Sequence, residues 1–122
     1  MLLKECYDAF GGDYESVRQR ISKDDIIKKF VIKFLSEPSF GNLSSALERE
    51  AYEEAFRAAH SLKGICANLA FKRLEASASE LTELLRHSAE EPVDKEKCKE
   101  VFKRVSVDYN AVVDAVRKLE QD

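Results

Sequence analysis

The chain has 122 residues, a length that suits a single domain over residues 1–122, and its 44% hydrophobic and 35% charged residues are typical of a globular protein. A formal net charge of −3 argues against nucleic acid as a partner, because an excess of basic side chains is needed to neutralise phosphates. No apolar run reaches the roughly 20 residues of a membrane-spanning helix, and no signal peptide is evident, so we expect a cytoplasmic protein without a membrane partner.

Two short helices are expected within residues 2–21, ahead of the main bundle. Gly11 and Gly12 end the first of them, because glycine readily leaves the helical conformation. Asp13 belongs to the residue types that cap helix N-termini, so we expect it to cap the second short helix, which extends to Ile21.

The next helix is expected between Ser22 and Pro38. Ser22 followed by Asp25 resembles a capping box with Asp in place of the usual Glu, and proline is incompatible with a helix interior. The predicted core stripe of this helix consists of Ile27, Phe30, Val31, Phe34 and Leu35, and its exposed side carries Lys28, Lys29 and Lys33.

A further helical segment follows within residues 40–50, where Ser45 and Glu48 form a second candidate capping box. Neither glycine nor proline separates this segment from the next helix, which is expected over residues 52–69. We predict a kink near Glu50, and the sequence leaves open whether the helix before residue 51 is continuous with the helix after it.

Two long helices complete the chain, the first from about Phe71 to His87 and the last from its expected cap at Asp94 to about Glu120. Apolar residues alternate at spacings of three and four in both, namely Leu74, Ala78, Leu81 and Leu85, and then Cys98, Val101, Val105, Tyr109, Val112, Val116 and Leu119. Such spacing is typical of the seam between bundle helices. We therefore predict an all-α fold, a monomeric antiparallel up-down four-helix bundle over about residues 23–120, with the short N-terminal helices covering one end.

The segment over residues 52–69 places its only histidine on the side opposite to its apolar residues. With an advance of about 100° per residue, one arc of this helix holds Ala55, Ala58, Ala59, Leu62, Ile65, Cys66 and Leu69. His60 then points away from the core, with Lys63 one turn further on and Phe56 one turn before it. A solvated helix face normally carries long polar side chains, so this combination of residues is unusual.

Gly64 lies on the same exposed side, four residues after His60. A glycine in a helix interior is less favourable than alanine by roughly 1 kcal/mol. It either removes side-chain bulk so that another molecule reaches His60, or is simply a tolerated helix glycine.

The run AHSLKGICANL resembles the signature of histidine-containing phosphotransfer (HPt) domains, which reads roughly A-H-[ST]-L-K-G-x-[SA]-x-x-[LIM]-G. The positions that match it are His60, Ser61, Leu62, Lys63, Gly64, Ala67, Asn68 and Leu69. Two positions depart from the pattern: Cys66 replaces a small residue on the buried arc, and Ala70 replaces the usual glycine at the helix end. Neither change affects the exposed side of the helix.

The resemblance implies that His60 accepts a phosphoryl group from a phospho-aspartate and passes it to another aspartate. The partners would be receiver domains of response regulators or hybrid kinases, and the expected Mg²⁺ would be bound by the receiver. Lys63 is suited to screen charge on the phosphoryl oxygens, and the expected docking residues are Phe56, Arg57, Gly64, Ala67 and Asn68. The sequence contains no nucleotide-binding loop and no acidic magnesium cluster, so we expect a phosphocarrier without a cofactor or a kinase activity of its own.

Some alternatives remain. A helical bundle that binds a signalling partner as a scaffold, without phosphotransfer, would fit the same composition, although it has no need for the His60, Lys63 and Gly64 set. The domain could also be part of a larger kinase, whereas the initial Met favours a free-standing relay protein. His87 is interpreted as a cap at a helix C-terminus, where a positive charge is favoured, with no catalytic role, and a metal site is not expected from two histidines 27 residues apart. The three cysteines, Cys6, Cys66 and Cys98, are expected to be reduced and buried.

Overall fold

The structure is a computed structural model that describes all 122 residues, and all of its regular secondary structure is helical. The elements in chain order are α1 (Leu3–Phe10), α2 (Tyr14–Arg20), α3 (Asp24–Lys33), the 3₁₀ turn η1 (Phe34–Ser36), α4 (Ser39–Glu48), α5 (Tyr52–Leu69), α6 (Lys72–Leu85) and α7 (Lys95–Gln121). None of these helices has the length and hydropathy of a membrane span.

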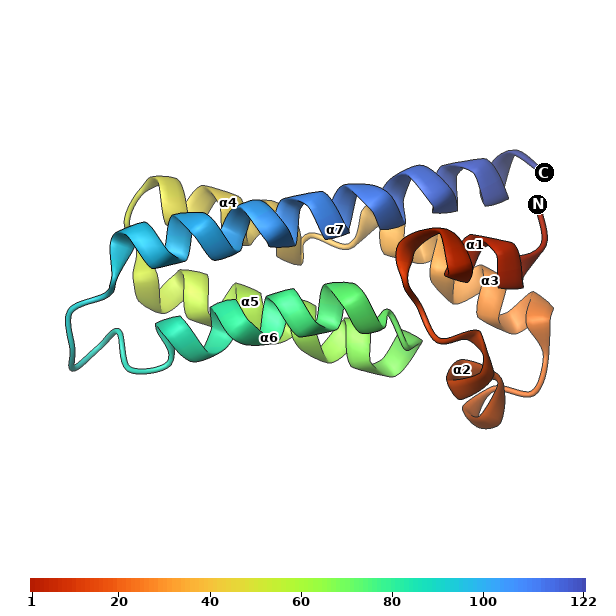
Figure 1. The fold of residues 1–122 in the computed structure, drawn as a ribbon, viewed down its shortest axis with the longest axis horizontal. Helices are drawn as coiled ribbons and strands as arrows, with labels where there is room; N and C mark the ends of the chain where they lie inside the picture. The colour runs from red at the N-terminus through yellow and green to blue at the C-terminus, as the bar shows by residue number, and fades with distance from the viewer.

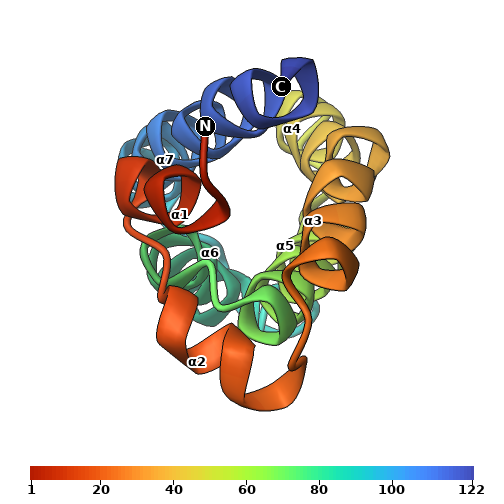
Figure 2. The same ribbon diagram turned by 90° about the vertical axis from the view of Figure 1, so that its right-hand side faces the viewer.

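The helices form an antiparallel four-helix bundle, which confirms the predicted fold class. Its four members are α5, α6, α7 and the segment that runs through α3, η1 and α4 (Figure 1). The longest helix, α7, extends along the whole bundle, and the end-on view shows the four members arranged around a common axis (Figure 2). The two short N-terminal helices, α1 and α2, lie at one end of the bundle, as the sequence predicts.

The N-terminal helices share the core of the bundle. One cluster of 29 buried hydrophobic residues includes Cys6, Tyr7, Phe10 and Val17 from α1 and α2 together with residues of all the later helices. The Tyr7 hydroxyl is buried and donates a hydrogen bond to the carbonyl of Leu69, at an O–O distance of 2.7 Å. These helices therefore hold the C-terminal end of α5 in place.

The predicted seams of the last two helices are confirmed. Every seam residue of α6 is buried, and so is every seam residue of α7 except Tyr109, which is half-buried. Its ring stacks on Phe40 of α4, with the ring centroids 3.9 Å apart and the planes only 6° from parallel. Tyr109 thus packs between helices although part of its surface reaches solvent.

Three of the predicted helix ends are also confirmed. Asp13 accepts a hydrogen bond from the backbone N–H of Ser16 at 3.0 Å, and Asp94 does the same for Lys97 at 3.1 Å. Gly11 ends α1 with a left-handed backbone, at φ +73°. These caps depend on contacts within one helical turn, which explains why the sequence reveals them.

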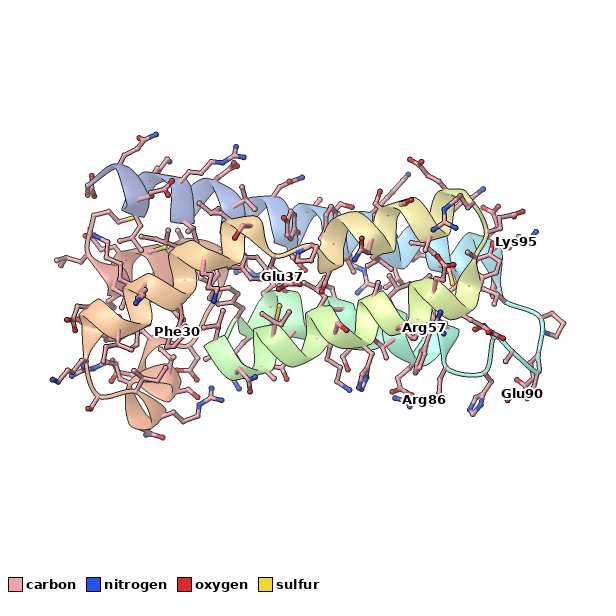
Figure 3. All side chains as sticks on the ribbon, turned by 180° about the vertical axis from the view of Figure 1, so that it is seen from behind. Phe30, Glu37, Arg57, Arg86, Glu90 and Lys95 are labelled. Carbon is pink, nitrogen blue, oxygen red and sulfur yellow. The ribbon has the colours of Figure 1, made fainter.

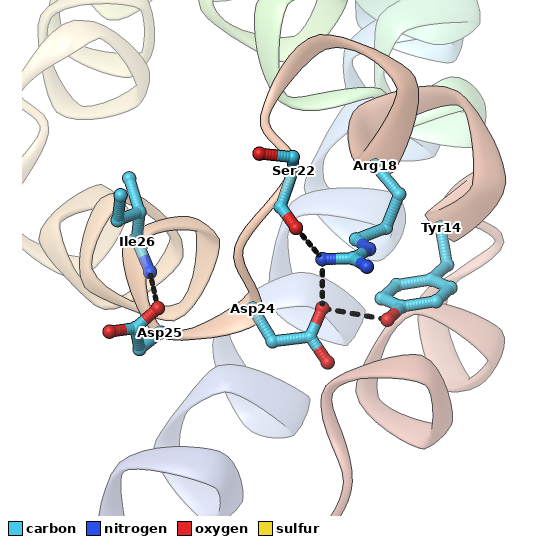
Figure 4. Close-up of polar contacts among 6 residues, drawn as sticks. All are labelled: Tyr14, Arg18, Ser22, Asp24, Asp25 and Ile26. Carbon is cyan, nitrogen blue, oxygen red and sulfur yellow. Dashed lines mark hydrogen bonds and ion pairs between the residues drawn. The ribbon is translucent and has the colours of Figure 1, made fainter.

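The capping box predicted at Ser22 and Asp25 is wrong. Helix α3 begins at Asp24, and the residue before it makes no side-chain cap. Figure 4 shows instead that Asp24 accepts a hydrogen bond from the Tyr14 hydroxyl at 2.7 Å and lies 3.4 Å from the Arg18 guanidinium, which also donates to the carbonyl of Ser22. Contacts with the neighbouring helix α2 thus replace the local box.

The second predicted capping box, at Ser45 and Glu48, is also wrong, because Ser45 lies in the middle of α4. This helix begins at Ser39, directly after Pro38, and the Glu37 carboxylate accepts hydrogen bonds from both the backbone N–H and the hydroxyl of Ser39. Pro38 therefore ends one helical segment and begins the next, since its fixed φ suits the first turn of a helix.

The predicted break near Glu50 is present, and the two helices on either side of it are separate. Glu50 has a left-handed backbone at φ +56°, and the N–H of Ala51 donates to the carbonyl of Ala46 at 2.8 Å. This is the hydrogen-bond pattern with which helices often end at glycine. A glutamate in this position gave no stop signal, and its side chain pairs with Lys95 at the start of α7, at 2.8 Å.

One member of the predicted core stripe of α3 is misplaced. Ile27, Val31 and Phe34 are buried and Leu35 is half-buried, but the Phe30 side chain is 46% exposed. The helix packs mainly on α7, and Phe30 lies at the edge of that contact, beside α5. Periodicity alone does not show how wide the buried stripe of a helix is.

Candidate functional site

The register of α5 agrees with the sequence pattern. Six residues of its apolar arc are buried and Ile65 is half-buried, the buried ones being Ala55, Ala58, Ala59, Leu62, Cys66 and Leu69. His60 and Gly64 lie on the opposite, exposed side. We call the solvent-facing set of His60, Gly64, Ala67 and Asn68 the His60 stripe.

The imidazole of His60 rests against the ring of Phe56, one helical turn earlier. The two ring centroids are 6.0 Å apart and the planes are inclined by 22°, which is a stacked arrangement. Phe56 is half-buried, so it is itself fixed by the bundle while its outer face remains available to the histidine. The exposed imidazole makes no hydrogen bond within the chain, so its nitrogen atoms are available for a reaction with another molecule.

Arg86 is a component of this site that the sequence analysis missed. Its Cζ atom lies 5.5 Å from the centroid of the Phe56 ring, within the range of a cation–π contact. Its guanidinium donates two hydrogen bonds to Glu83, from Nη2 at 2.6 Å and from Nε at 3.0 Å. Figure 3 shows Arg86 and Arg57 near the same end of the bundle.

The lengths of the two helices place Arg86 at the right level of the bundle but do not show that it faces Phe56. Helices α5 and α6 are antiparallel and meet at the turn of Ala70 and Phe71. Because both rise by about 1.5 Å per residue, residue 86 lies at about the level of residue 55. In the sequence, the spacing of three residues between Glu83 and Arg86 at the end of α6 indicates an ion pair at this level.

Several charged side chains lie close to Glu83, whose partner Arg86 contacts Phe56. The hydrogen bonds from Arg86 hold the pKa of the Glu83 carboxyl below its usual value, and the nearby charges of Lys63 and His87 act in the same direction. Lys63 is half-buried and Arg57 is exposed, and neither forms an ion pair within the chain. Their charge is therefore available to an anionic group at His60.

Gly64 is not required by close packing. A Cβ atom built at this position has no neighbouring atom within 4 Å, apart from the backbone of its own helix. The same is true of Gly41, which is also exposed but belongs to a different helix, α4. Open space alone therefore does not assign a function to Gly64, and Gly41 provides a matched comparison.

The remaining residues of the predicted docking set lie near the C-terminal end of α5. Asn68 is exposed and Ala67 is half-buried. The carbonyl of Ala67 accepts a hydrogen bond from the Arg20 guanidinium of α2 at 3.0 Å. Ala70 ends the helix with φ +59°, so alanine adopts the conformation that glycine usually provides there. The departure from the motif at this position does not change how the helix ends.

His87 is not a helix cap as the sequence analysis predicted. Helix α6 ends at Leu85, and His87 lies in the following turn, where its backbone carbonyl accepts hydrogen bonds from Glu90 and Glu91. Its exposed ring has Nδ1 4.0 Å from the Glu90 carboxylate. The two histidines of the chain are thus both exposed but lie in different surroundings.

A comparison with protein-family models finds that the Hpt domain model matches residues 36–121. The match covers more than two thirds of the chain, from the end of η1 through α7, and includes the whole of α5. Helices α1, α2 and α3 precede it. Neither the comparison with curated proteins nor that with solved structures gives a match.

Proposed function

Because the chain belongs to the Hpt domain family, whose members are phosphocarriers of phosphorelays and have no kinase site of their own, we propose that His60 is the residue that carries the phosphoryl group. The observation that supports this role is the exposed imidazole on the matched helix, stacked on Phe56 with cations nearby. A neutral imidazole is a good nucleophile near pH 7.

The reaction needs two receiver domains in turn, in line with the interaction of Hpt domains with receivers. An imidazole nitrogen attacks the phosphorus of an aspartyl phosphate on the first receiver. A P–N bond forms, the P–O bond to the aspartate breaks, and the carboxylate leaves with the electron pair. In the second step a carboxylate of another receiver attacks the phosphohistidine, and the imidazole leaves. The receivers supply the acidic pocket and its Mg²⁺.

Lys63 and Arg86 have different roles in this proposal. Lys63 follows His60 by one turn and has no ion-pair partner, so its ammonium group is free to screen the charge on the phosphoryl oxygens. Arg86 is held by Glu83 and lies over Phe56, so it supports the platform on which the imidazole rests. Phe56, Arg57, Gly64, Ala67 and Asn68 form the docking surface for the receiver.

The proposal extends to the whole chain. We propose one domain over residues 1–122, because α1 and α2 contribute to the same core as the matched region. We propose that the protein acts as a monomer in the cytoplasm, and its three cysteines are free thiols in keeping with a reducing compartment.

The test uses the two histidines of the chain as a matched pair. The protein is incubated with a panel of receivers that carry labelled phospho-aspartate, and the label on this chain is examined for acid lability and alkali stability. The wild-type chain and His87→Gln are expected to accept the label from at least one receiver, and His60→Gln is expected to accept none. Both variants are expected to have a free energy of unfolding within about 0.5 kcal/mol of the wild-type value, because both side chains are exposed.

Two outcomes would contradict the proposal. Label on His60→Gln at the wild-type level would place the phosphoryl group on another residue. A wild-type chain that binds receivers but accepts label from none of them would indicate a scaffold without phosphotransfer.

A further inference from the structure

The end of α5 takes hydrogen-bond donors from the N-terminal helices. The last carbonyls of a helix lack partners within it, and a buried carbonyl without a donor is unfavourable. The carbonyl of Leu69, the last residue of α5, accepts from the Tyr7 hydroxyl at 2.7 Å, and that of the following Ala70 accepts from the N–H of Asp13 at 2.8 Å. Both Leu69 and Ala70 are buried, so the N-terminal segment supplies what water cannot.

A third donor comes from the exposed side of α2. The Arg20 guanidinium donates to the carbonyl of Ala67 at 3.0 Å, a carbonyl that also accepts from the N–H of Ala70 at 3.3 Å. The positive charge of Arg20 thus lies at the C-terminal end of α5, where the helix dipole favours a cation. We call Tyr7, Asp13 and Arg20 the N-terminal clamp.

The N-terminal clamp is anchored in the core beside the turn between α5 and α6 (Figure 1). The Tyr7 ring meets Phe71 of this turn edge-on at a centroid distance of 5.6 Å, and Phe10 does so at 4.9 Å. The start of α6 returns a contact, because the N–H of Arg73 donates to the carbonyl of Gly11 at 3.2 Å. The clamp therefore contacts both sides of the turn.

Gly12 shows how closely the two segments approach each other. A Cβ atom built at this position would lie 2.6 Å from the Tyr7 ring, 2.7 Å from the Phe10 ring and 3.3 Å from the carbonyl oxygen of Ala70. These distances are shorter than real Cβ contacts allow, so only glycine fits here without a shift of its neighbours. The chain passes directly against the end of α5.

The last turn of α5 needs such contacts more than an ordinary helix end does. Ala70 has a left-handed backbone, at φ +59°, which is unfavourable for alanine and costs little for the glycine of the motif. Helix ends open more readily than helix centres. This turn carries Ala67 and Asn68, two residues of the proposed docking surface, and a docking surface that is only partly populated binds more weakly in proportion.

We propose that Tyr7 and Arg20 are positioning residues for phosphotransfer, which hold the last turn of α5 in the conformation that a receiver domain binds. This inference rests on the proposed function. It assigns a role to helices that precede the region matched by the family model, which begins at residue 36. The clamp contributes to docking through α5, and the chemical step stays with His60 and Lys63.

The first test compares two arginines of α2. Arg20→Ala removes the donor to α5, whereas Arg18→Ala removes a guanidinium that contacts Asp24 and Ser22 instead. Arg20→Ala is expected to raise the half-saturating receiver concentration about threefold, since the docking conformation is less populated, and to leave the rate at saturating receiver unchanged. Arg20→Lys keeps a cationic donor and is expected to restore docking. Arg18→Ala is expected to dock like the wild type.

The second test uses a clamp residue that no receiver can touch. Tyr7 has no exposed surface, so a docking defect in Tyr7→Phe acts through α5. Tyr52→Phe is the control, because it removes a hydroxyl that donates to Glu50 at the other end of the same helix. Tyr7→Phe is expected to weaken docking about threefold and Tyr52→Phe to leave it unchanged. If Tyr7→Phe fails to fold, the two arginine variants decide.

Two measurements without a receiver separate positioning from general damage. Hydrogen exchange of the free protein is expected to be about threefold faster at the amides of Ala70 and Phe71 in Arg20→Ala and Tyr7→Phe, and unchanged in the control variants. Phosphoramidate phosphorylates imidazoles without a protein partner, so all variants are expected to form phosphohistidine from it at the wild-type rate.

Several results would overturn the proposal. Faster exchange with unchanged docking would reduce the clamp to a structural contact, and slower labelling by phosphoramidate would indicate a damaged site. Weak docking of Arg20→Ala together with normal docking of Tyr7→Phe would mean that Arg20 touches the receiver directly. In each of these cases the role of His60 would still stand. If no receiver labels the wild type, the proposed function and this inference both fail.

Discussion

The two faces of α5 are formed by residues that lie close together in the chain, but one face is buried in the core and the other is exposed to solvent. Ala59 and Leu62 have no exposed surface, while His60 and Gly64 face solvent. The buried face packs on α4 and α6, and the exposed face presents an oriented imidazole. Because the helix has 3.6 residues per turn, the residues that stabilise the fold and those proposed to act in phosphoryl transfer lie on different faces. Substitutions on the buried face should therefore affect mainly stability, and substitutions on the exposed face mainly transfer.

The largest expected effect is on the buried face. Leu62→Ala removes a fully buried side chain and leaves a cavity, so we expect a loss of about 2–5 kcal/mol in the free energy of unfolding. In a domain of this size each kcal/mol lowers Tm by about 4 °C. Ser61→Ala, at the exposed neighbouring position, is expected to stay within about 0.5 kcal/mol. Thermal melts of both variants test the assignment of faces, and equal stability of the two would refute it.

The next largest effect is expected at Gly64, with Gly41 as the control, because an added Cβ meets no neighbouring atom at either position. Gly64→Gln is expected to reduce transfer from a receiver about 100-fold, comparable to the loss of an essential contact, because the new side chain stands beside His60. Gly41→Gln is expected to transfer like the wild type. Neither variant is expected to melt lower, since a helix interior disfavours glycine by about 1 kcal/mol. A lower melting temperature for Gly64→Gln alone would mean that this position packs against another part of the chain.

A smaller effect is expected from removing the unpaired cation beside His60. Lys63→Ala is expected to slow transfer at saturating receiver about tenfold. This is less than the roughly 100-fold loss of rate that follows removal of a hydrogen-bond donor from a water-excluded site, because Lys63 is partly solvated. The half-saturating receiver concentration is expected to change little. Lys103→Ala removes the same charge from the exposed side of α7 and serves as the control. Equal losses in affinity and rate for Lys63→Ala would make it an ordinary docking contact.

The smallest effect concerns the ring under the imidazole. Phe56→Leu keeps apolar bulk but removes the stack on His60 and the platform for Arg86, and we expect about a threefold rise in the half-saturating receiver concentration, below 1 kcal/mol. Phe56→Ala is expected to weaken docking further, because it also removes apolar area. The His60 ring-proton shifts in NMR spectra should move in both variants as the ring current disappears. Unchanged shifts would show that the two rings do not stack in solution.

Many features of the site were predictable because they depend on spacing within one helix. The exposure of His60 and Gly64, the partial exposure of Phe56 and the burial of Leu62 all follow from the helical period. Arg86 was missed because it is 26 residues from His60 in the chain, and only the antiparallel packing of α6 on α5 brings it to Phe56.

The ends of the helices divide in the same way. Asp13 and Asp94 cap their helices through backbone groups three residues away, so the sequence identifies them. Ser22 and Asp25 form no box, because Asp24 is engaged by Tyr14 and Arg18 from another helix. Glu50 and Ala70 adopt the left-handed conformation without being glycine, at a local cost of about 1–2 kcal/mol each that the packed helices on either side offset.

By itself, the sequence determined the helical class, the bundle and the face of α5 that bears His60, because periodicity and local capping depend only on residues that are close together in the chain. Only the tertiary structure decided that Phe30 faces solvent beside α5 and that Arg86 lies over Phe56. Both outcomes depend on how wide each helix contact is and on which faces of neighbouring helices turn toward one another. Such distances between helices are set by the packing of the whole core, and no short stretch of sequence encodes them.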